Sequence, residues 1–265
     1  MIDAAHVDTD PSSDPWSGKT ALVTGSTRGL GRTTAEHLAQ RGTDLVVSGR
    51  IQLDVEKAVF ELSGAGVKVI GIAADLSKTS EAHRLAESAI ASVGKLDILV
   101  NNAGMSIRGD FWNVSDKEWE NQVNVNIRSP FILAQYAARN MIALQTKGRI
   151  VNVGTIGARR CHTNACVYDM AKGGVEVMTR NMAYELGPHG IGVNCVVPGA
   201  IPIRPGSSFD SEANQSYLSH VPFGRFGEAD DIAAAVIFFC NPRTEFTTGQ
   251  SLLVDGGHAT WLPVL

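Results

Sequence analysis

The sequence predicts a single α/β domain, in which helices cover both faces of a doubly wound parallel sheet of about seven strands. Short apolar runs rich in β-branched residues alternate with longer helical patterns, and this alternation is typical of a parallel sheet covered on both faces. A glycine-rich turn joins the first apolar run to the first helical pattern. The 265 residues, 44% of them hydrophobic, supply one large core. No second core and no internal repeat is visible.

The expected strands are the short apolar runs. In chain order they cover 20–23, 45–47, 67–73, 97–101, 149–153, 192–197 and 251–254. Near-continuous apolar character of this kind indicates strands buried on both faces. The crossovers between parallel neighbours are expected to be right-handed.

Helical patterns fill the intervals between these runs. They extend from the glycine turn to 40, then over 53–62, 80–93, a long region 115–145, 165–186 and 229–239. The segment 201–224 is the exception, because it is rich in Pro, Ser and Gly and has weak helical potential. We expect it to form a mobile flap beside the substrate site. Residues 1–15 are expected to form a flexible tail, and 16–265 the folded domain.

Composition excludes several classes of function. The net charge of −4 gives no electrostatic footprint for nucleic acid or an anionic membrane. No apolar run approaches the ~20 residues of a membrane helix, and the N-terminus lacks the basic start and apolar stretch of a signal peptide. The four cysteines form no C-x-x-C pair, so we expect free buried thiols, no metal site and a cytoplasmic location.

The glycine-rich turn has the pattern of a dinucleotide-binding site. It reads Thr24-Gly25-Ser26-Thr27-Arg28-Gly29-Leu30-Gly31, directly after the first strand and before a helix. Glycines allow a tight turn and a close approach to a pyrophosphate, and the helix that follows offers free N–H groups and a positive dipole end. The turn therefore predicts that a dinucleotide binds here.

The end of the second strand bears on the choice of dinucleotide. It reads Ser48-Gly49-Arg50, without the acid that would bind the ribose 2′-hydroxyl of NAD. Asp54 falls on the next helix, where a solvated charge is the simpler interpretation. Arg50 instead offers a planar fork suited to a 2′-phosphate, and Arg28 adds a second cation. NADP(H) is the favoured cofactor, with NAD(H) as the alternative.

A possible acid/base pair lies on the helical pattern 165–186. Tyr168 and Lys172 are four residues apart and so share a helix face, and Thr155 precedes Tyr168 by thirteen positions. A tyrosine held near an ammonium group loses its proton more readily. The pair could therefore transfer a proton near neutral pH.

Taken together, these motifs resemble the short-chain dehydrogenase/reductase family in its single-domain form, over residues 16 to 257. The resemblance rests on the order of T-G-x-x-x-G-x-G at 24–31, Asp75-Leu76, Asn101-Asn102-Ala103-Gly104, Asn126, Thr155, Tyr168-x-x-x-Lys172, Pro198-Gly199 and Asp255-Gly256-Gly257. It implies a Rossmann-like fold and hydride transfer between a nicotinamide cofactor and a carbonyl or secondary alcohol. Relatives pair their long helices between subunits, so a homotetramer or homodimer is expected.

The resemblance also implies roles for individual residues. Tyr168 would be the general acid or base, and Lys172 would bind the nicotinamide ribose and lower the pKa of Tyr168. Asn126 would bend its helix and hold a water that links Lys172 to solvent. Asp75 would bind the adenine. Further cofactor contacts are expected from Gly25, Thr27, Arg28, Gly29, Leu30, Gly31, Arg50, Leu76, Asn102, Ala103, Gly104, Pro198, Gly199 and Ile201.

Two positions depart from the family pattern. Thr155 replaces the usual Ser; its hydroxyl can still polarise a carbonyl, while its methyl group restricts rotation and narrows the pocket. Ile203 stands where relatives commonly have Thr, so one hydroxyl contact with the cofactor is missing or comes from the backbone.

The substrate remains open at this level. His162 could contact substrate or simply belong to a loop, and Trp261 could close the pocket or pack on another subunit. If two of Arg108, Arg159, Arg160 and Arg204 face the cleft, an anionic or polyhydroxylated substrate would fit; otherwise they are solvated or subunit-contact residues. The favoured function is NADP(H)-dependent carbonyl reduction. The alternatives are an oxidative sugar or polyol dehydrogenase, and a dinucleotide-binding protein without catalysis.

Overall fold

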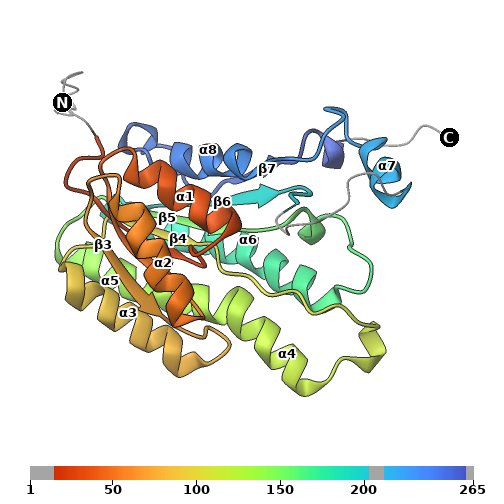
Figure 1. The fold of residues 1–265 in the computed structure, drawn as a ribbon, viewed down its shortest axis with the longest axis horizontal. Coiled ribbons are helices and arrows are strands. Elements are labelled where there is room, and N and C mark those ends of the chain that lie inside the picture. Colours follow the sequence, from red (N-terminus) through yellow and green to blue (C-terminus); the bar gives the residue numbers. More distant parts are fainter. Residues whose placement is uncertain (1–14, 203–211, 261–265) are drawn as a thin grey trace.

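The computed structural model describes residues 15–202 and 212–260, which form one parallel seven-stranded sheet in the order β3-β2-β1-β4-β5-β6-β7 (Figure 1). The strands are β1 (Thr20–Thr24), β2 (Asp44–Gly49), β3 (Val69–Ala73), β4 (Ile98–Asn101), β5 (Arg149–Val153), β6 (Gly192–Pro198) and β7 (Ser251–Val254). Every neighbouring pair is parallel. The predicted Rossmann-like α/β fold is confirmed, and each expected strand is present within two residues of its predicted ends.

Helices cover both faces of this sheet (Figure 1). They are α1 (Gly29–Ala39), α2 (Gln52–Ser63), α3 (Thr79–Val93), α4 (Asp116–Val123), α5 (Ser129–Ala143), α6 (Cys166–Leu186), α7 (Glu212–Leu218) and α8 (Ala229–Cys240). Adjacent residues of a strand point to opposite faces. Leu22 of β1 therefore packs in the core with Leu85 of α3 and Leu133 of α5, while Val23 packs in the other core with Leu38 and Ile232 of α1 and α8.

The order of the strands reverses direction between β1 and β4. From β1 the chain builds outward through β2 and β3, and from β4 it builds the other way through β5, β6 and β7. Open α/β sheets bind ligands at such a switch point, outside the carboxyl ends of the strands. The motifs at 24–31, 101–104, 155 and 198–199 all follow these ends.

The predicted long helix over 115–145 is present with an internal change of pitch. Ser115 begins it with a capping box, since its hydroxyl accepts from the Glu118 N–H and the Glu118 carboxylate accepts from the Ser115 N–H. One π-helical segment, Asn124–Arg128, then joins α4 to α5. Such a segment widens the helix locally and is frequent at functional sites.

The segment 201–224 contains a helix that the sequence did not predict. The short α7 spans Glu212–Leu218, and its sequence EANQSYL is made largely of good helix formers. The Pro, Ser and Gly content of the whole segment obscured these seven residues. Residues 203–211, including Ile203 and Arg204, lie outside the described residues, as do residues 1–14 of the expected tail at 1–15 and Trp261.

Within 15–202 and 212–260, none of the helices has the length and apolar character needed to span a bilayer.

Candidate active site

The glycine turn between β1 and α1 is fixed by a polar side chain from β4. The amide nitrogen of Asn102 donates to the carbonyl oxygens of Thr24 (2.9 Å) and Gly25 (3.2 Å). In return, the Thr24 hydroxyl accepts from the backbone N–H groups of Asn102 and Ala103, both at 3.0 Å. The two strands on either side of the switch point are thereby tied together directly beneath the turn.

The turn also depends on glycine at particular positions. Gly25 and Gly29 have φ values of +63° and +55°, in the left-handed region that favours glycine. A Cβ on Gly31 would overlap the Asn102 amide and the Gly25 carbonyl. Helix α1 begins at Gly29 without a side-chain cap, so its first N–H groups are available to a phosphate.

The end of β2 lies beside this turn. Thr27 packs so closely on Gly49 that no Cβ fits there. Arg28 and Arg50 are both exposed, and neither forms an ion pair with another described residue. Asp54 is exposed in the first turn of α2, as expected for a solvated charge. Two guanidinium groups are therefore free to meet an anion at this corner.

The Asp75-Leu76 pair follows β3. Lys78, not Asp75, directly precedes α3, and the Asp75 carboxylate accepts from the N–H (3.2 Å) and the hydroxyl (2.8 Å) of Ser77. The Leu76 side chain is buried in the core, and its carbonyl accepts from the Ser129 hydroxyl. The motif thus shapes the loop after β3, with Asp75 only partly buried.

Thr155, Tyr168 and Lys172 meet at the carboxyl end of β5. Tyr168 and Lys172 lie one turn apart on α6, and Thr155 begins the short helix after β5. Thr155 lies near enough to Tyr168 to lower the pKa of its phenol, and the Thr155 hydroxyl accepts from the Gly157 N–H at 3.4 Å. Lys172 is 2% exposed, and its ammonium group donates to the Val153 carbonyl at 2.7 Å. The three residues of the sequence motif therefore lie together in the structure.

The protonation of these groups differs from the sequence-based expectation. Burial raises the pKa of Tyr168 above its ordinary value, and this outweighs the lowering by the nearby Thr155 hydroxyl and by the charge of Arg108. Lys172 was expected to lower the pKa of Tyr168, but it is not among the groups that shift it. Burial lowers the pKa of Lys172 itself to about 8.

Asn126 lies in the π-helical segment and is fully buried. Its amide nitrogen donates to the carbonyls of Met105 (2.7 Å) and Gln122 (2.9 Å), and its amide oxygen accepts from the Met105 N–H (3.1 Å). A Cβ built on Gly104 would lie 3.5 Å from the Asn126 oxygen and 3.8 Å from the Lys172 nitrogen. Asn126 and Lys172 are therefore close neighbours across Gly104.

A buried polar chain beneath the site was missed by the sequence analysis. Asn101 donates to the Asn152 side-chain oxygen at 2.9 Å, and Asn152 donates to the Thr179 hydroxyl at 2.9 Å. This chain links β4, β5 and α6. Asn152 could have been singled out, because an amide inside a strand buried on both faces needs a partner.

A cavity of about 840 Å³ opens beside these residues, within the size range of ligand sites. Its lining includes Thr155, Tyr168, Gly199 and Ile201 from the predicted site. Pro198 ends β6 and is buried, and Gly199 approaches Asp255 too closely for a Cβ. Pro202 and Tyr217 also line it, and they belong to the segment 201–224 that was expected to lie beside the substrate site. The lining that sequence did not indicate comprises Ser106, Ile156, Cys161, Thr163, Ala200, Phe226 and His258.

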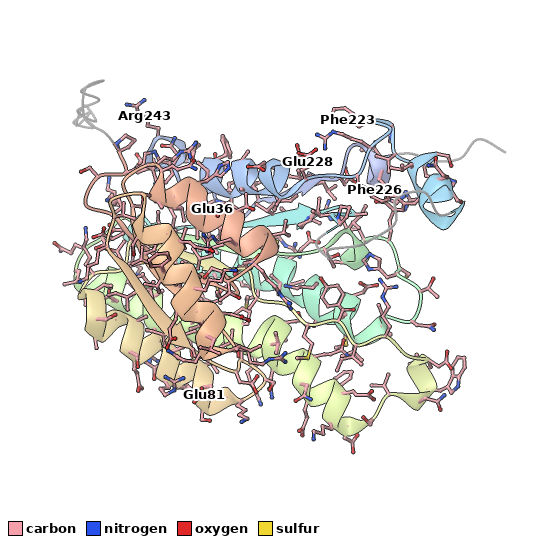
Figure 2. All side chains as sticks on the ribbon, viewed as in Figure 1. Glu36, Glu81, Phe223, Phe226, Glu228 and Arg243 are labelled. Carbon is pink, nitrogen blue, oxygen red and sulfur yellow. The ribbon has the colours of Figure 1, made fainter. Side chains whose placement is uncertain are left out.

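One wall of the cavity comes from the segment around α7. Tyr217 of α7 stacks on Phe226, with ring centroids 5.4 Å apart, and its hydroxyl accepts from the Ala200 N–H at 3.2 Å. Phe226 lies beside α7, at the opposite end of the molecule from Arg243 (Figure 2). No periodic pattern marks these aromatic residues as neighbours, so only the folded chain shows this wall.

Four of the five basic candidates lie within the described residues, and they are placed differently; Arg204 lies outside them. Arg108, Arg160 and His162 line the cavity. Arg159 does not; its guanidinium pairs with the Glu176 carboxylate at 2.7 Å. His162 is hydrogen-bonded to Asp169, its Nδ1 lying 2.8 Å from the carboxylate. Two arginines therefore face the cleft, which is the condition stated above for an anionic or polyhydroxylated substrate.

The cysteines do not form a reactive or metal-binding group. Cys195 and Cys240 are buried, and burial raises the pKa of each thiol to about 12. The expectation that all four are buried is wrong, since Cys161 and Cys166 are exposed on the loop before α6 and at its start. Across the described parts of the chain, no group of His, Cys, Asp or Glu is arranged to hold a metal ion.

Comparison with known proteins agrees with this geometry. The family model described as "Enoyl-(Acyl carrier protein) reductase" matches residues 25–259. L-xylulose reductase of Mesocricetus auratus is 36% identical over 91% of this chain and 96% of its own. The 2-dehydro-3-deoxy-D-gluconate 5-dehydrogenase of Escherichia coli is 33% identical over 92% and 96%. A blue fluorescent protein from a metagenomic library, solved in complex with NADPH, superposes with a TM-score of 0.85 at 33% identity, over 92% of this chain and 99% of its own.

Proposed function

The chain belongs to the short-chain dehydrogenase/reductase family and is an oxidoreductase of alcohol or carbonyl groups, and we propose that it uses NADP(H), with Tyr168 as general acid and base. The convergence of Thr155, Tyr168 and Lys172 beside a cavity of about 840 Å³ carries this proposal. A non-catalytic protein would have no need to bury an ammonium group at the end of β5, because burial of a charge is costly.

The residues at the switch point fit a nicotinamide dinucleotide. Gly31 has no room for a Cβ, so the turn stays tight. The first N–H groups of α1 are free and can bind a pyrophosphate. Asp75 would face the adenine and Lys172 the nicotinamide ribose. When bound, the dinucleotide accepts or supplies the hydride. The protein supplies alignment and proton transfer.

In carbonyl reduction, Tyr168 donates its phenolic proton to the substrate oxygen. Thr155 donates a hydrogen bond to the same oxygen and so stabilises the negative charge that develops there. Since burial keeps the pKa of Tyr168 high, the phenol is protonated at neutral pH and ready to act as an acid. Asn126, close to Lys172 across Gly104, would hold the water that returns a proton from solvent through Lys172.

Arg28 and Arg50 support the preference for NADP(H). Both are exposed and without ionic partners among the described residues, and no acid stands at 48, 49 or 50. A phosphate accepts bidentate hydrogen bonds from a guanidinium group. The structural relative in complex with NADPH is consistent with this choice.

The test of this proposal is turnover with NADPH and NADH, each over a panel of carbonyl substrates. We expect kcat/KM to favour NADPH in the wild type. Arg50→Ala should lower kcat/KM for NADPH by about 10- to 100-fold, the effect of losing a hydrogen-bonded charge, and should leave kcat/KM for NADH unchanged. A wild-type enzyme that prefers NADH would overturn the assignment of Arg28 and Arg50.

A second candidate is oxidative dehydrogenation of a sugar or polyol. Two relatives are named after sugar-derived substrates. The cavity has both polar and apolar residues in its lining. This function would show as rapid reduction of NADP⁺ or NAD⁺ with polyols and little activity on simple ketones. The same panel, run in both directions, separates the two candidates.

A further inference from the structure

Two arginines of the cavity come from different loops. Arg108 lies between β4 and α4, and Arg160 lies between β5 and α6. Both line the same cavity as Thr155 and Tyr168. Among the described residues of the lining there is no aspartate or glutamate. The cavity therefore carries positive charge next to the site of proton transfer.

The loop that carries Arg108 is fixed on both sides of it. The N–H of Ile107 donates to the side-chain oxygen of Gln122 at 2.9 Å, and the N–H of Gly109 donates to the Asn164 carbonyl at 3.0 Å. Gln122 is 1% exposed. Arg108 itself donates to the Thr163 carbonyl at 3.1 Å. This single contact leaves most of the donors of its guanidinium group available, because the group has five N–H donors.

Arg160 is held in a similar way from the other side. One arm of its guanidinium group donates to the His258 carbonyl at 2.7 Å, and its backbone N–H donates to the Ile156 carbonyl at 2.9 Å. Neither Arg160 nor Arg108 forms an ion pair with a described residue. The adjacent Arg159 does, at 2.7 Å from Glu176. The fold thus neutralises one arginine of the loop and leaves the cavity arginines without a counter-charge.

Nearby carboxylates are already occupied by other donors. Asp169 accepts from the N–H and the imidazole of His162, both at 2.8 Å. Asp255 accepts from the N–H groups of Gly257 (3.0 Å) and Ala259 (2.7 Å). The Nδ1 atom of His258, a residue of the cavity lining, is buried without a hydrogen-bond partner. Among the described residues, neither carboxylate forms an ion pair with Arg108 or Arg160.

We propose that the substrate carries an anionic group, a carboxylate or a phosphate, which Arg108 and Arg160 bind while Tyr168 and Thr155 hold its reacting oxygen. The inference rests on the proposed function, since it names the substrate class of the same site. Guanidinium groups match the geometry of both anions. Arg108 is exposed and Arg160 is half-buried, so water can solvate both charges. An anion would still gain charge-assisted hydrogen bonds from them that an uncharged polyol could not make.

Direct binding to the protein saturated with oxidised cofactor tests this without requiring turnover. The ligands are a series of oxo acids and hydroxy acids, each paired with its methyl ester, and hydroxyketone phosphates, each paired with the free hydroxyketone. Calorimetry should give at least one acid or phosphate that binds about 10- to 100-fold more tightly than its neutral partner, as expected for charge-assisted hydrogen bonds. Comparing the two series distinguishes carboxylate from phosphate.

Variants assign the effect to the two arginines. Arg108→Gln and Arg160→Gln should each reduce that preference by about tenfold or more, and Arg108→Lys should retain part of it because the charge is kept. Arg243→Gln is the matched control: Arg243 is exposed and lies at the far end of α8 from Phe226 of the cavity (Figure 2). Arg243→Gln should prefer the anion over its neutral partner as strongly as the wild type does.

The inference is overturned if every neutral partner binds as tightly as its anion, or if both glutamine variants keep the wild-type preference. Its failure is distinguishable from failure of the proposed function. If the wild type turns over neutral ketones with NADPH while no anion binds more tightly than its neutral partner, the anionic substrate is rejected and the oxidoreductase proposal stands.

Discussion

Thr155 contributes a buried hydroxyl to the cavity that Tyr168 also lines, in place of the usual serine. The loss of one hydrogen-bond donor to a developing oxyanion costs about 10²-fold or more in turnover. We therefore expect Thr155→Ala to reduce kcat by about 10²-fold, with binding of cofactor unchanged. Steady-state kinetics and cofactor titration measure the two quantities.

The matched control for this substitution is Thr155→Ser, which keeps the hydroxyl and removes only the methyl group. It should retain turnover and accept bulkier substrates, because the methyl group narrows the cavity. If Thr155→Ala stays within a factor of two of the wild type, Thr155 has no role in polarising the substrate.

Lys172 makes the stability of the protein depend on pH. Burial lowers its pKa in the folded state from 10.5 to about 8. Below pH 8 the folded and unfolded states both carry the ammonium group, and the folded state bears its full desolvation cost. Between pH 8 and 10.5 the folded state loses the proton while the unfolded state keeps it, so folding becomes more favourable as pH rises. The shift corresponds to roughly 3 kcal/mol.

We therefore compare Lys172→Met with the wild type by denaturant unfolding, without cofactor. The stability of the variant relative to the wild type should be greatest at pH 7 and should decline by pH 10, while its turnover is lost at both. A stability difference that is the same at both pH values would show that Lys172 is not titrating with a lowered pKa.

At the scale of elements, the joint between β1, α1 and β4 determines where the cofactor can lie. Asn102 bridges the carbonyls of Thr24 and Gly25, and Gly31 leaves no room for a Cβ against either Asn102 or Gly25. Gly31→Ala must therefore displace the turn. We expect it to weaken dinucleotide binding by about tenfold or more, since backbone N–H groups would no longer converge on the pyrophosphate.

Calorimetric titration with NADPH measures the effect of Gly31→Ala. Gly187→Ala is the control, because a Cβ there meets nothing within 4 Å at the end of α6. It should bind NADPH like the wild type. Unchanged affinity in Gly31→Ala would mean that the turn does not hold the pyrophosphate.

The sequence was most informative about elements with local periodicity. The strands and the long helices follow from apolar runs and helical patterns, and the position of Tyr168, Lys172 and Thr155 follows from their place at strand ends. The short helix α7 was missed because its helix formers are surrounded by Pro, Ser and Gly. The direction of the Tyr168 pKa shift was also missed, since burial depends on tertiary packing that no local spacing reveals.

The cavity lining shows the same limit more clearly. Arg159 and Arg160 are adjacent in sequence, yet one pairs with Glu176 and the other lines the cavity. Which of two neighbouring side chains faces a cleft depends on the path of the loop. Tyr217, Phe226 and His258 likewise come together from separate parts of the chain.

For the whole molecule, we propose assembly through the face formed by α5 and α6. The lining of a groove on this face includes five apolar side chains, Ile127, Phe131, Val177, Met178 and Met182, beside Arg128, Asn181 and Glu185. Phe131 and Val177 are 45% and 49% exposed. Apolar side chains gathered on two long helices are typical of a subunit interface. The wild type should be a dimer or tetramer by light scattering, and Phe131→Glu should shift it to a smaller species.

The control for assembly is Phe60→Glu, since Phe60 of α2 is 83% exposed and lies outside this groove. It should leave the oligomeric state unchanged. A monomeric wild-type protein would rule out assembly through α5 and α6, without bearing on the chemistry.

The most direct test of the account is the turnover of Tyr168→Phe beside that of the wild type, with NADPH and a carbonyl substrate found active in the panel. The variant keeps the ring and loses only the proton donor. We predict that kcat falls by about 10²- to 10⁴-fold, the contribution of a general acid, while calorimetry shows NADPH bound as tightly as in the wild type. A variant that retains turnover within a factor of two would contradict the assignment of Tyr168 as the catalytic acid and base.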